Sequence, residues 1–145
     1  MRIAIIGATG AVGHECLKLL ESTFRHIEIS SLGLFGTERS VGSKLTCRGE
    51  TFTVQATRND LFQGYDVALF SAGGDVARHL VPYAKNAGCV VIDNSSAFRS
   101  DPKVPLVVPE INGHALQNHQ KIIANPNCTT TIALMALYPL HRDWD

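Results

Sequence analysis

The amino-acid sequence predicts an α/β domain built on a doubly wound, mostly parallel sheet with helices on both faces. Short β-branched apolar runs alternate along the chain with segments of helical periodicity, a pattern typical of βαβ units. A glycine-rich turn follows the first apolar run, and later runs also end in turns of small and polar residues. In doubly wound sheets ligands bind at the carboxyl ends of the strands, so these turns are the candidate sites.

The first half of the chain predicts a strand, a helix, a second strand and a hairpin, in that order. They are expected at Arg2–Ile6, Ala11–Glu21, Ile27–Phe35 and Leu45–Val54. The apolar positions at helical spacing, which predict the buried face of the helix, are Val12, Cys16, Leu19 and Leu20. Gly33 is expected to bend the second strand, and Gly49-Glu50 to turn the hairpin.

The second half continues the alternation and ends in a helix. Strands are expected at Asp66–Phe70, Val90–Ile92, Leu106–Val108 and Lys121–Ala124, and helices at Asp75–Asn86, Gly113–Asn118 and Cys128–Leu140. In the first of these helices Val76, Leu80 and either Tyr83 or Ala84 are expected to face inward. The 145 residues are expected to form one domain, large enough to bury a core.

The composition argues against several classes of partner. The 13 basic and 13 acidic residues balance, so electrostatic binding of nucleic acid or of a membrane surface is not expected. No apolar stretch approaches the roughly 20 residues that span a bilayer, and the N-terminus does not have the pattern of a signal peptide. Cys16, Cys47, Cys89 and Cys128 lack a CxxC spacing, which predicts no metal site, no disulfide framework and a reducing cytoplasm.

The turn between the first strand and the first helix predicts a dinucleotide site. Its candidate cofactor-binding residues are Gly7, Thr9, Gly10, Ala11, Val12 and Gly13. Glycines allow the backbone to turn tightly beside a pyrophosphate, and the helix N-terminus offers free N–H groups. The spacing is GxxGxxG, a variant of the usual GxGxxG in the strand-to-helix context that the mechanism requires. The alternative is a glycine-rich turn without a ligand.

The segment after the second strand is expected to contact the adenosine ribose. An acidic residue there favours the free 2′-hydroxyl of NAD, whereas an arginine accommodates the 2′-phosphate of NADP. Thr37, Arg39 and Ser40 suit a 2′-phosphate, although Glu38 lies among them. NADP is therefore the predicted cofactor, with a solvated surface loop as the alternative.

Cys128 lies where a polar turn opens the last expected helix. Pro126 disfavours helical geometry at Asn125, so the strand ends there, and Asn127 is a good N-cap. The dipole and free N–H groups of a helix N-terminus favour thiolate over thiol and can hold the oxyanion of a carbonyl under attack. Cys128 is therefore the predicted nucleophile, with a merely packed thiol as the alternative. The other three cysteines are expected to be core or incidental residues.

Five motifs follow one another along nearly the whole chain. They are Gly7–Gly13 (GATGAVG), Leu69–Gly74 (LFSAGG), Val91–Arg99 (VIDNSSAFR), Val107–Asn112 (VVPEIN) and Asn125–Thr130 (NPNCTT). Together they resemble the aspartate-β-semialdehyde dehydrogenase family, which implies a Rossmann-like domain. The resemblance also implies a reductive dephosphorylation, in which a thiolate attacks β-aspartyl phosphate, phosphate leaves and NADPH reduces the thioester to aspartate semialdehyde. This reaction belongs to the lysine, threonine and methionine branch of amino-acid biosynthesis.

The resemblance implies roles for individual residues. Cys128 matches the family's nucleophile, and Arg99 matches the arginine that binds phosphate or the substrate's phosphoryl group. It also implies that Asn94 and Asn127 belong to the substrate site, and that Ser71, Ala72, Gly73 and Gly74 lie against the cofactor. A planar guanidinium holds phosphate through two parallel hydrogen bonds, which agrees with the role of Arg99. The alternative for Arg99 is a surface pair with Asp101.

Members of the resembled family are more than twice as long as this chain. Their second domain supplies a general acid/base histidine, the arginine for the substrate carboxylate and most of the interface of a homodimer or homotetramer. The six histidines of this chain match no catalytic position and receive no role. Residues 1–145 are therefore expected to be the cofactor-binding half of a longer enzyme and to be inactive alone.

Three other functions remain open. N-acetyl-γ-glutamyl-phosphate reductase shares the fold and the thiol chemistry, but its cysteine turn is typically Pro-Gly-Cys-Tyr-Pro. Glyceraldehyde-3-phosphate dehydrogenase shares the Cys-Thr-Thr step, with different flanking residues. A non-catalytic module that binds NADP is the alternative from another class.

Overall fold

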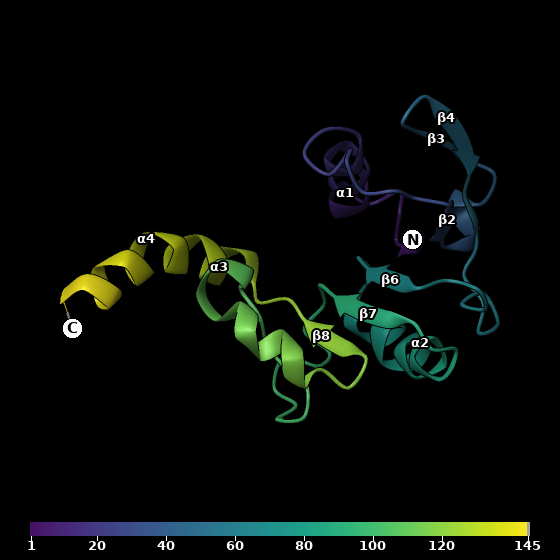
Figure 1. Ribbon diagram of the computed structural model, residues 1–145. Coiled ribbons are helices and arrows are strands. Elements are labelled where there is room, and N and C mark those ends of the chain that lie inside the picture. The colour runs from purple at the N-terminus through teal and green to yellow at the C-terminus, as the bar shows by residue number, and fades with distance from the viewer. Residues whose placement is uncertain (145) are drawn as a thin grey trace.

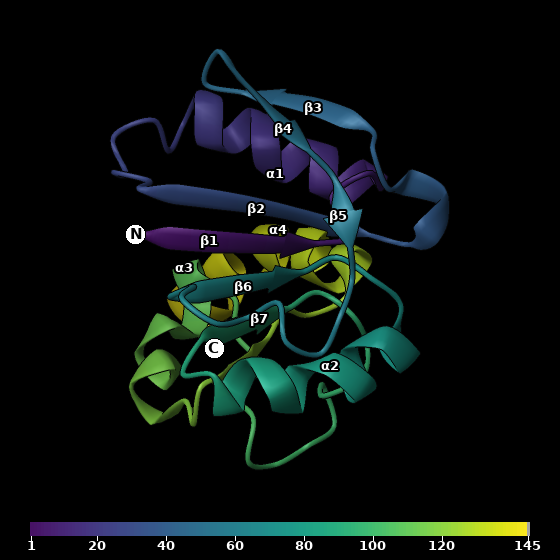
Figure 2. The ribbon, with the colours of Figure 1, turned by 90° about the vertical axis from the view of Figure 1, so that its right-hand side faces the viewer.

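A computed structural model describes residues 1–144, so Asp145, the last residue of the expected domain, lies outside the described part. The strands of the main sheet are β1 (Arg2–Ile6), β2 (Ser31–Gly36), β5 (Gln55–Ala56), β6 (Val67–Phe70), β7 (Val90–Asp93) and β8 (Ile122–Ala124). Their order is β5-β2-β1-β6-β7-β8, and every neighbouring pair is parallel. Figure 2 shows β2, β1, β6 and β7 side by side in this order. The expected doubly wound sheet is confirmed.

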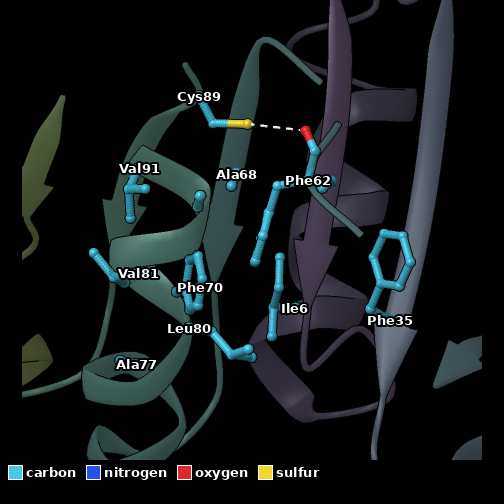
Figure 3. Packing of buried hydrophobic residues seen from close by; sticks show 12 residues of the cluster. Ile6, Phe35, Phe62, Ala68, Phe70, Ala77, Leu80, Val81, Cys89 and Val91 are labelled. Carbon is cyan, nitrogen blue, oxygen red and sulfur yellow. Dashed lines mark hydrogen bonds between the residues drawn. The ribbon is translucent and has the colours of Figure 1, made fainter. Parts of the chain in front are cut away.

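Side chains of β1 alternate between two cores. Ile3 and Ile5 pack on the face covered by α1 (Ala11–Glu21), whereas Ala4 and Ile6 pack on the face covered by α2 (Gly74–Asn86). The two helices lie on opposite sides of the sheet (Figure 1). Figure 3 shows the second core, where Phe70 of β6 lies close to α2. Helices therefore cover both faces, as expected.

The buried faces of both helices differ in part from the expected ones. The buried residues are Gly13, Leu17 and Leu20 in α1, and Ala77, Leu80, Val81 and Ala84 in α2. The residues expected inside but found at the surface are Val12, Leu19 and Val76, and of the alternatives Tyr83 and Ala84 it is Ala84 that is buried. Glycine and alanine let each helix approach the sheet closely, so small residues face the core beside the leucines.

β2 starts later than expected, at Ser31 rather than Ile27. Ile27 closes a turn after α1, where its N–H donates to the Phe24 carbonyl at 3.0 Å. Gly33 makes no bend, because it pairs regularly with Ala4 of β1. The Tyr65 side chain fills the space that a Cβ at Gly33 would need, which explains the glycine.

β3 (Lys44–Cys47) and β4 (Glu50–Thr53) form the expected hairpin, with its turn at Arg48-Gly49 rather than Gly49-Glu50. Both turn residues have positive φ, 55° and 83°, as a type I′ turn requires. The Arg48 guanidinium donates to the carbonyls of Leu20, Phe24 and Ile27 at 2.8 to 3.0 Å. This arginine therefore fixes the hairpin against the end of α1.

The C-terminal third contains short elements and one long helix. Leu106 forms only an isolated parallel bridge to Ala124, so the strand expected at Leu106–Val108 does not form. α3 (Pro109–Asn112) and the 3₁₀ helix η2 (Gly113–Asn118) precede β8. α4 (Cys128–Trp144) passes the expected end at Leu140 and extends away from the sheet (Figure 1). None of the helices in residues 1–144 is long and apolar enough to cross a membrane.

Candidate active site

The carboxyl ends of four strands line up in one row across the sheet. Gly7, Ser71, Asn94 and Asn125 directly follow β1, β6, β7 and β8. Each donates its backbone N–H to a carbonyl at the end of the neighbouring strand, at 2.8 to 2.9 Å. Neighbouring strands lie about 4.8 Å apart, so the row spans about 14 Å from Gly7 to Asn125. The turns predicted from the sequence therefore share one edge of the sheet.

The glycine turn and the turn after β6 touch where the strand order switches. β1 has β2 on one side and β6 on the other, so the chain crosses over in opposite directions from this point. Gly7 has a φ of 86°, and a Cβ there would lie 2.6 Å from the Ser71 carbonyl oxygen. A Cβ at Gly13 would lie 2.5 Å from the carbonyl oxygens of Gly7 and Ala8. Both positions therefore require glycine.

Two helices begin at this switch point. α1 follows Gly10 and α2 follows Gly73, so neither N-cap has a side chain to bond the N–H groups of the first turn. Thr9, Ala11 and Val12 belong to the first of these helix starts, and Gly74 to the second. The positive ends of both helix dipoles lie at the same edge of the sheet, which suits the phosphates of a dinucleotide.

A hollow of about 220 Å³ opens between these turns. Its lining residues are Ile6, Gly7, Gly36, Thr37, Glu38, Thr57, Ala72 and Val76. Ser40 lies beside it in the 3₁₀ helix η1 (Glu38–Ser40), and its Oγ donates to the Thr37 carbonyl at 2.9 Å. Arg39 of η1 is exposed and makes no hydrogen bond or ion pair within residues 1–144. Of the predicted cofactor residues, Gly7, Thr37 and Ala72 line this hollow.

Thr57 and Val76 line this hollow but were not expected there. Thr57 follows β5, and its Oγ1 donates to the Gly36 carbonyl at 2.8 Å. β5 has only two residues, which is too short to show periodicity in the sequence. Val76 was expected in the core, where Ala77 lies instead. The position of Thr57 directly after the end of a strand was the one signal in the sequence that could have indicated it.

Arg99 joins the loops that follow β7 and β8. Its Nε donates to the Asn125 carbonyl and its Nη2 to the Asn94 carbonyl, both at 2.9 Å. The side-chain amide of Asn125 also donates to Asn94 Oδ1, at 2.7 Å. The alternative pair with Asp101 does not form, because the Asp101 carboxylate accepts the Lys103 N–H instead.

Arg99 keeps its positive charge available for a ligand. Its hydrogen-bond partners within residues 1–144 are neutral carbonyls, and no carboxylate pairs with it there. The buried carboxylate of Asp93 accepts the Oγ–H and N–H of Ser95, at 2.7 and 3.0 Å. Since two backbone bonds already hold the guanidinium, it is preorganised for an oxyanion.

Cys128 is the first residue of α4 and is exposed. Asn127 caps this helix as expected, because its Oδ1 accepts the N–H groups of Thr129 at 3.0 Å and Thr130 at 3.4 Å. The cap corrects one expectation. Two of the N–H groups that were expected to hold an oxyanion already bond the capping amide, which leaves the N–H of Cys128 itself for that purpose.

The other three cysteines lie in the interior or at its edge, as expected. Burial raises the pKa of the thiols of Cys16, Cys47 and Cys89. The Cys89 thiol donates to the carbonyls of Phe62 and Tyr65, and the first of these bonds is drawn in Figure 3. Cys128 is thus the one exposed cysteine of residues 1–144.

The fold and the glycine turn define the class of protein. A parallel sheet with a glycine turn and two uncapped helix starts at its switch point is a Rossmann-like dinucleotide-binding domain. Within residues 1–144 no group of three His, Cys, Asp or Glu side chains is placed to hold a metal ion. The family model described as semialdehyde dehydrogenase, NAD binding domain, matches residues 2–119, and the chain belongs to that family. The family match supports the expected nicotinamide cofactor.

Individual relatives agree with this assignment. The chain is 51% identical over 142 residues to aspartate-semialdehyde dehydrogenase of Synechocystis sp., which covers 98% of this chain and 41% of that protein. A crystal structure of aspartate semialdehyde dehydrogenase II from Vibrio cholerae complexed with ASA has a TM-score of 0.91 at 43% identity, over 98% of this chain and 46% of the other. The Candida albicans enzyme with NADP has a TM-score of 0.73 at 26% identity, over 99% and 47%. The chain thus spans less than half of each relative.

Proposed function

We propose that this chain is the cofactor-binding and nucleophile-bearing part of an NADP-dependent aspartate-semialdehyde dehydrogenase. The observation that carries the proposal is the row of Gly7, Ser71, Asn94 and Asn125, which connects the glycine turn at one end with Arg99 and the Cys128 turn at the other. The overall reaction converts β-aspartyl phosphate, NADPH and a proton to aspartate semialdehyde, NADP⁺ and phosphate.

In this mechanism Cys128 attacks the acyl carbon of β-aspartyl phosphate with its Sγ. The carbon–oxygen bond to the phosphoryl group breaks, phosphate leaves with the electron pair, and a thioester to Cys128 remains. Arg99 holds the phosphoryl oxygens and then the leaving phosphate, while Asn94 and Asn127 orient the substrate beside it. The cofactor, when bound, supplies the hydride that reduces the thioester. Expulsion of the Cys128 thiolate then gives the aldehyde.

The cofactor preference is proposed to be NADP. Arg39 has no partner within residues 1–144, so its guanidinium can bind a 2′-phosphate through two donors. Thr37 and Ser40 add polar groups at the same place, beside the hollow that Glu38 also lines. The ribose of NAD has a free 2′-hydroxyl and would leave Arg39 without a counter-charge. In that case Glu38 would be the hydrogen-bond partner of the 2′-hydroxyl.

We extend the proposal to the protein as a whole. The chain spans 41% of the Synechocystis relative, and the general acid/base histidine is proposed to come from a segment that corresponds to the rest of that relative. Ile132, Leu137 and Trp144 of α4 are 72%, 58% and 79% exposed, which supports such a covering segment. The full-length enzyme is proposed to act as a cytoplasmic homodimer or homotetramer in the synthesis of lysine, threonine and methionine.

Turnover by the full-length protein tests the proposed function. NADP⁺-dependent, phosphate-dependent oxidation of aspartate semialdehyde is expected, and Cys128→Ser is expected to lower kcat by roughly a thousand-fold or more. Cys16→Ser is the matched control and should retain the rate. Faster turnover of N-acetylglutamate semialdehyde would assign the alternative reductase, and binding of NADP without turnover of either aldehyde would assign a non-catalytic module.

A further inference from the structure

A second hollow adjoins the one beside the glycine turn. It has a volume of about 380 Å³, and its lining residues are Thr57, Asn59, Asp75, Val76, His79 and Leu80. Thr57 and Val76 line both hollows, so the two are direct neighbours. A ligand that fills the first hollow can therefore continue into the second.

The lining of the second hollow suits an uncharged flat group rather than a phosphate. Val76 and Leu80 give it an apolar wall on α2. Its charged lining residue is Asp75, whose carboxylate pairs with Arg78 at 2.7 Å, and no lysine or arginine of residues 1–144 lines it. A carboxylate repels phosphate, whereas an apolar wall binds the face of an aromatic base.

Two polar side chains in this hollow hold each other in place. His79 Nε2 and Asn59 Oδ1 lie 3.0 Å apart in a hydrogen bond. The His79 ring also packs on Tyr83, with ring centroids 5.7 Å apart. Asn59 keeps one further lone pair on its oxygen and both hydrogens of its nitrogen for a ligand. The amide therefore presents one acceptor and one donor side by side.

We propose that Asn59, positioned by His79, selects adenine as the base of the bound dinucleotide. This inference rests on the proposed binding of NADP. Asn59 Oδ1 accepts a hydrogen bond from the 6-amino group of adenine, and Asn59 Nδ2 donates to N7, the pairing that asparagine makes with adenine elsewhere. Hypoxanthine carries a carbonyl oxygen in place of the amino group, so the two oxygens face each other and the first bond is lost.

Titration calorimetry with NADP⁺ and with its hypoxanthine analogue tests this pairing. The unsubstituted protein should bind NADP⁺ roughly ten-fold more tightly than the analogue, as expected for one lost hydrogen bond. Asn59→Ala should bring the ratio of the two Kd values close to one, because NADP⁺ loses both bonds to Asn59 whereas the analogue loses only the bond to N7. His79→Phe keeps the packing on Tyr83 but removes the donor, and it should lower the same ratio. Asn86→Ala, at the far end of α2, is the matched control and should keep it.

The possible outcomes separate this inference from the proposed function. Equal affinity of the unsubstituted protein for both dinucleotides would overturn the role of Asn59, and so would an unchanged ratio in Asn59→Ala. Failure of the unsubstituted protein to bind NADP⁺ at all would instead overturn the proposed cofactor. Because Asn59 is exposed, its substitution is not expected to alter folding, which the thermal unfolding midpoint of each variant checks.

Discussion

Arg99 donates its guanidinium Nε to the backbone carbonyl of Asn125 at 2.9 Å. The acceptor lies three positions before Cys128, so an arginine of one loop sets the path by which another loop enters α4. The same guanidinium is the proposed holder of the phosphoryl group. In the proposed mechanism, binding of the phosphoryl group and placement of Cys128 therefore both depend on Arg99.

Replacement of this arginine by lysine tests the structural part of that relationship. A lysine keeps the charge but cannot bond both the Asn94 and Asn125 carbonyls from one rigid plane. Arg99→Lys is expected to lower the free energy of unfolding by about 2 kcal/mol, measured by urea denaturation. Arg58→Lys, in an exposed pair with Asp60, is the control and should change stability little. Equal effects of the two substitutions would contradict the role of Arg99.

The glycine turn predicts a steric effect at Gly13. A Cβ there would lie 2.5 Å from the carbonyl oxygens of Gly7 and Ala8, so backbone must move to admit it. Gly13→Ala is expected to destabilise the fold by about 2 kcal/mol and to weaken dinucleotide binding. Gly113→Ala is the control, since its φ is −54° and no atom lies within 4 Å of the added carbon. Stability at or above the unsubstituted value in Gly13→Ala would show that the turn can relax.

Arg2 and Asp66 predict a loss of stability in acid. Hydrogen bonds from the Arg2 guanidinium and backbone N–H lower the pKa of Asp66 from 3.8 to about 2. Because the pKa of Asp66 is lower in the folded state than in the unfolded state, its pairing with Arg2 adds to the free energy of unfolding. This stabilisation is complete above pH 3.8 and disappears as the pH falls towards 2. The stability difference between the unsubstituted protein and Asp66→Asn should therefore shrink over this interval in urea titrations.

The control for this pH effect is Asp60→Asn. Asp60 pairs with Arg58, which lies only two positions away, so the pair can also form in the unfolded chain. It therefore contributes less to the free-energy difference between the folded and unfolded states. A stability difference for Asp66→Asn that stayed constant from pH 5 to pH 2 would contradict the Arg2 pairing.

Arg39 predicts the discrimination between the two nicotinamide cofactors. Arg39→Ala removes the proposed partner of the 2′-phosphate, so NADP⁺ should bind roughly ten-fold more weakly while NAD⁺ binds as before. Calorimetry or the ligand-dependent rise in the unfolding midpoint measures both affinities. Arg25→Ala, on the exposed turn after α1, is the control. An equal loss of affinity for NADP⁺ and NAD⁺ would contradict the role of Arg39 and would indicate recognition of the ribose hydroxyl by Glu38 instead.

The four cysteines predict a pattern of alkylation. Iodoacetamide should modify Cys128 first in the folded protein, because it is the one exposed cysteine of residues 1–144. Cys16, Cys47 and Cys89 should react mainly after unfolding, since burial raises the pKa of each thiol. Mass spectrometry of the digested protein reports each site. A folded-state rate for Cys128 no higher than that for Cys16 would remove the support for an activated nucleophile.

Local patterns predict the strands and turns of the site well. Apolar runs mark β1, β6 and β7, and the small or polar residues just after these strands are Gly7, Ser71 and Asn94. A parallel sheet brings such strand ends to one edge whatever the crossovers between them, so the site follows from the strand assignment alone. The cap by Asn127 follows in the same way from its side-chain chemistry.

Features that depend on close approach could not be predicted. Gly13 faces the interior because the turn before it leaves no room for a side chain, and hydropathy counts glycine as neutral. Arg48 reads as a surface residue of a hairpin, yet its guanidinium bonds three carbonyls across a long separation in sequence. Thr57 follows a strand of two residues. Each of these positions is set by tertiary contacts that no local pattern contains.

The row of strand ends has a consequence for how this domain can vary in length. The row consists of the first residue after each of four paired strands, namely Gly7, Ser71, Asn94 and Asn125. Since side chains alternate along a strand, one inserted residue within β6 or β7 would turn the next residue to the opposite face of the sheet. Insertions and deletions are therefore expected to be tolerated in the crossovers and the hairpin rather than inside these strands.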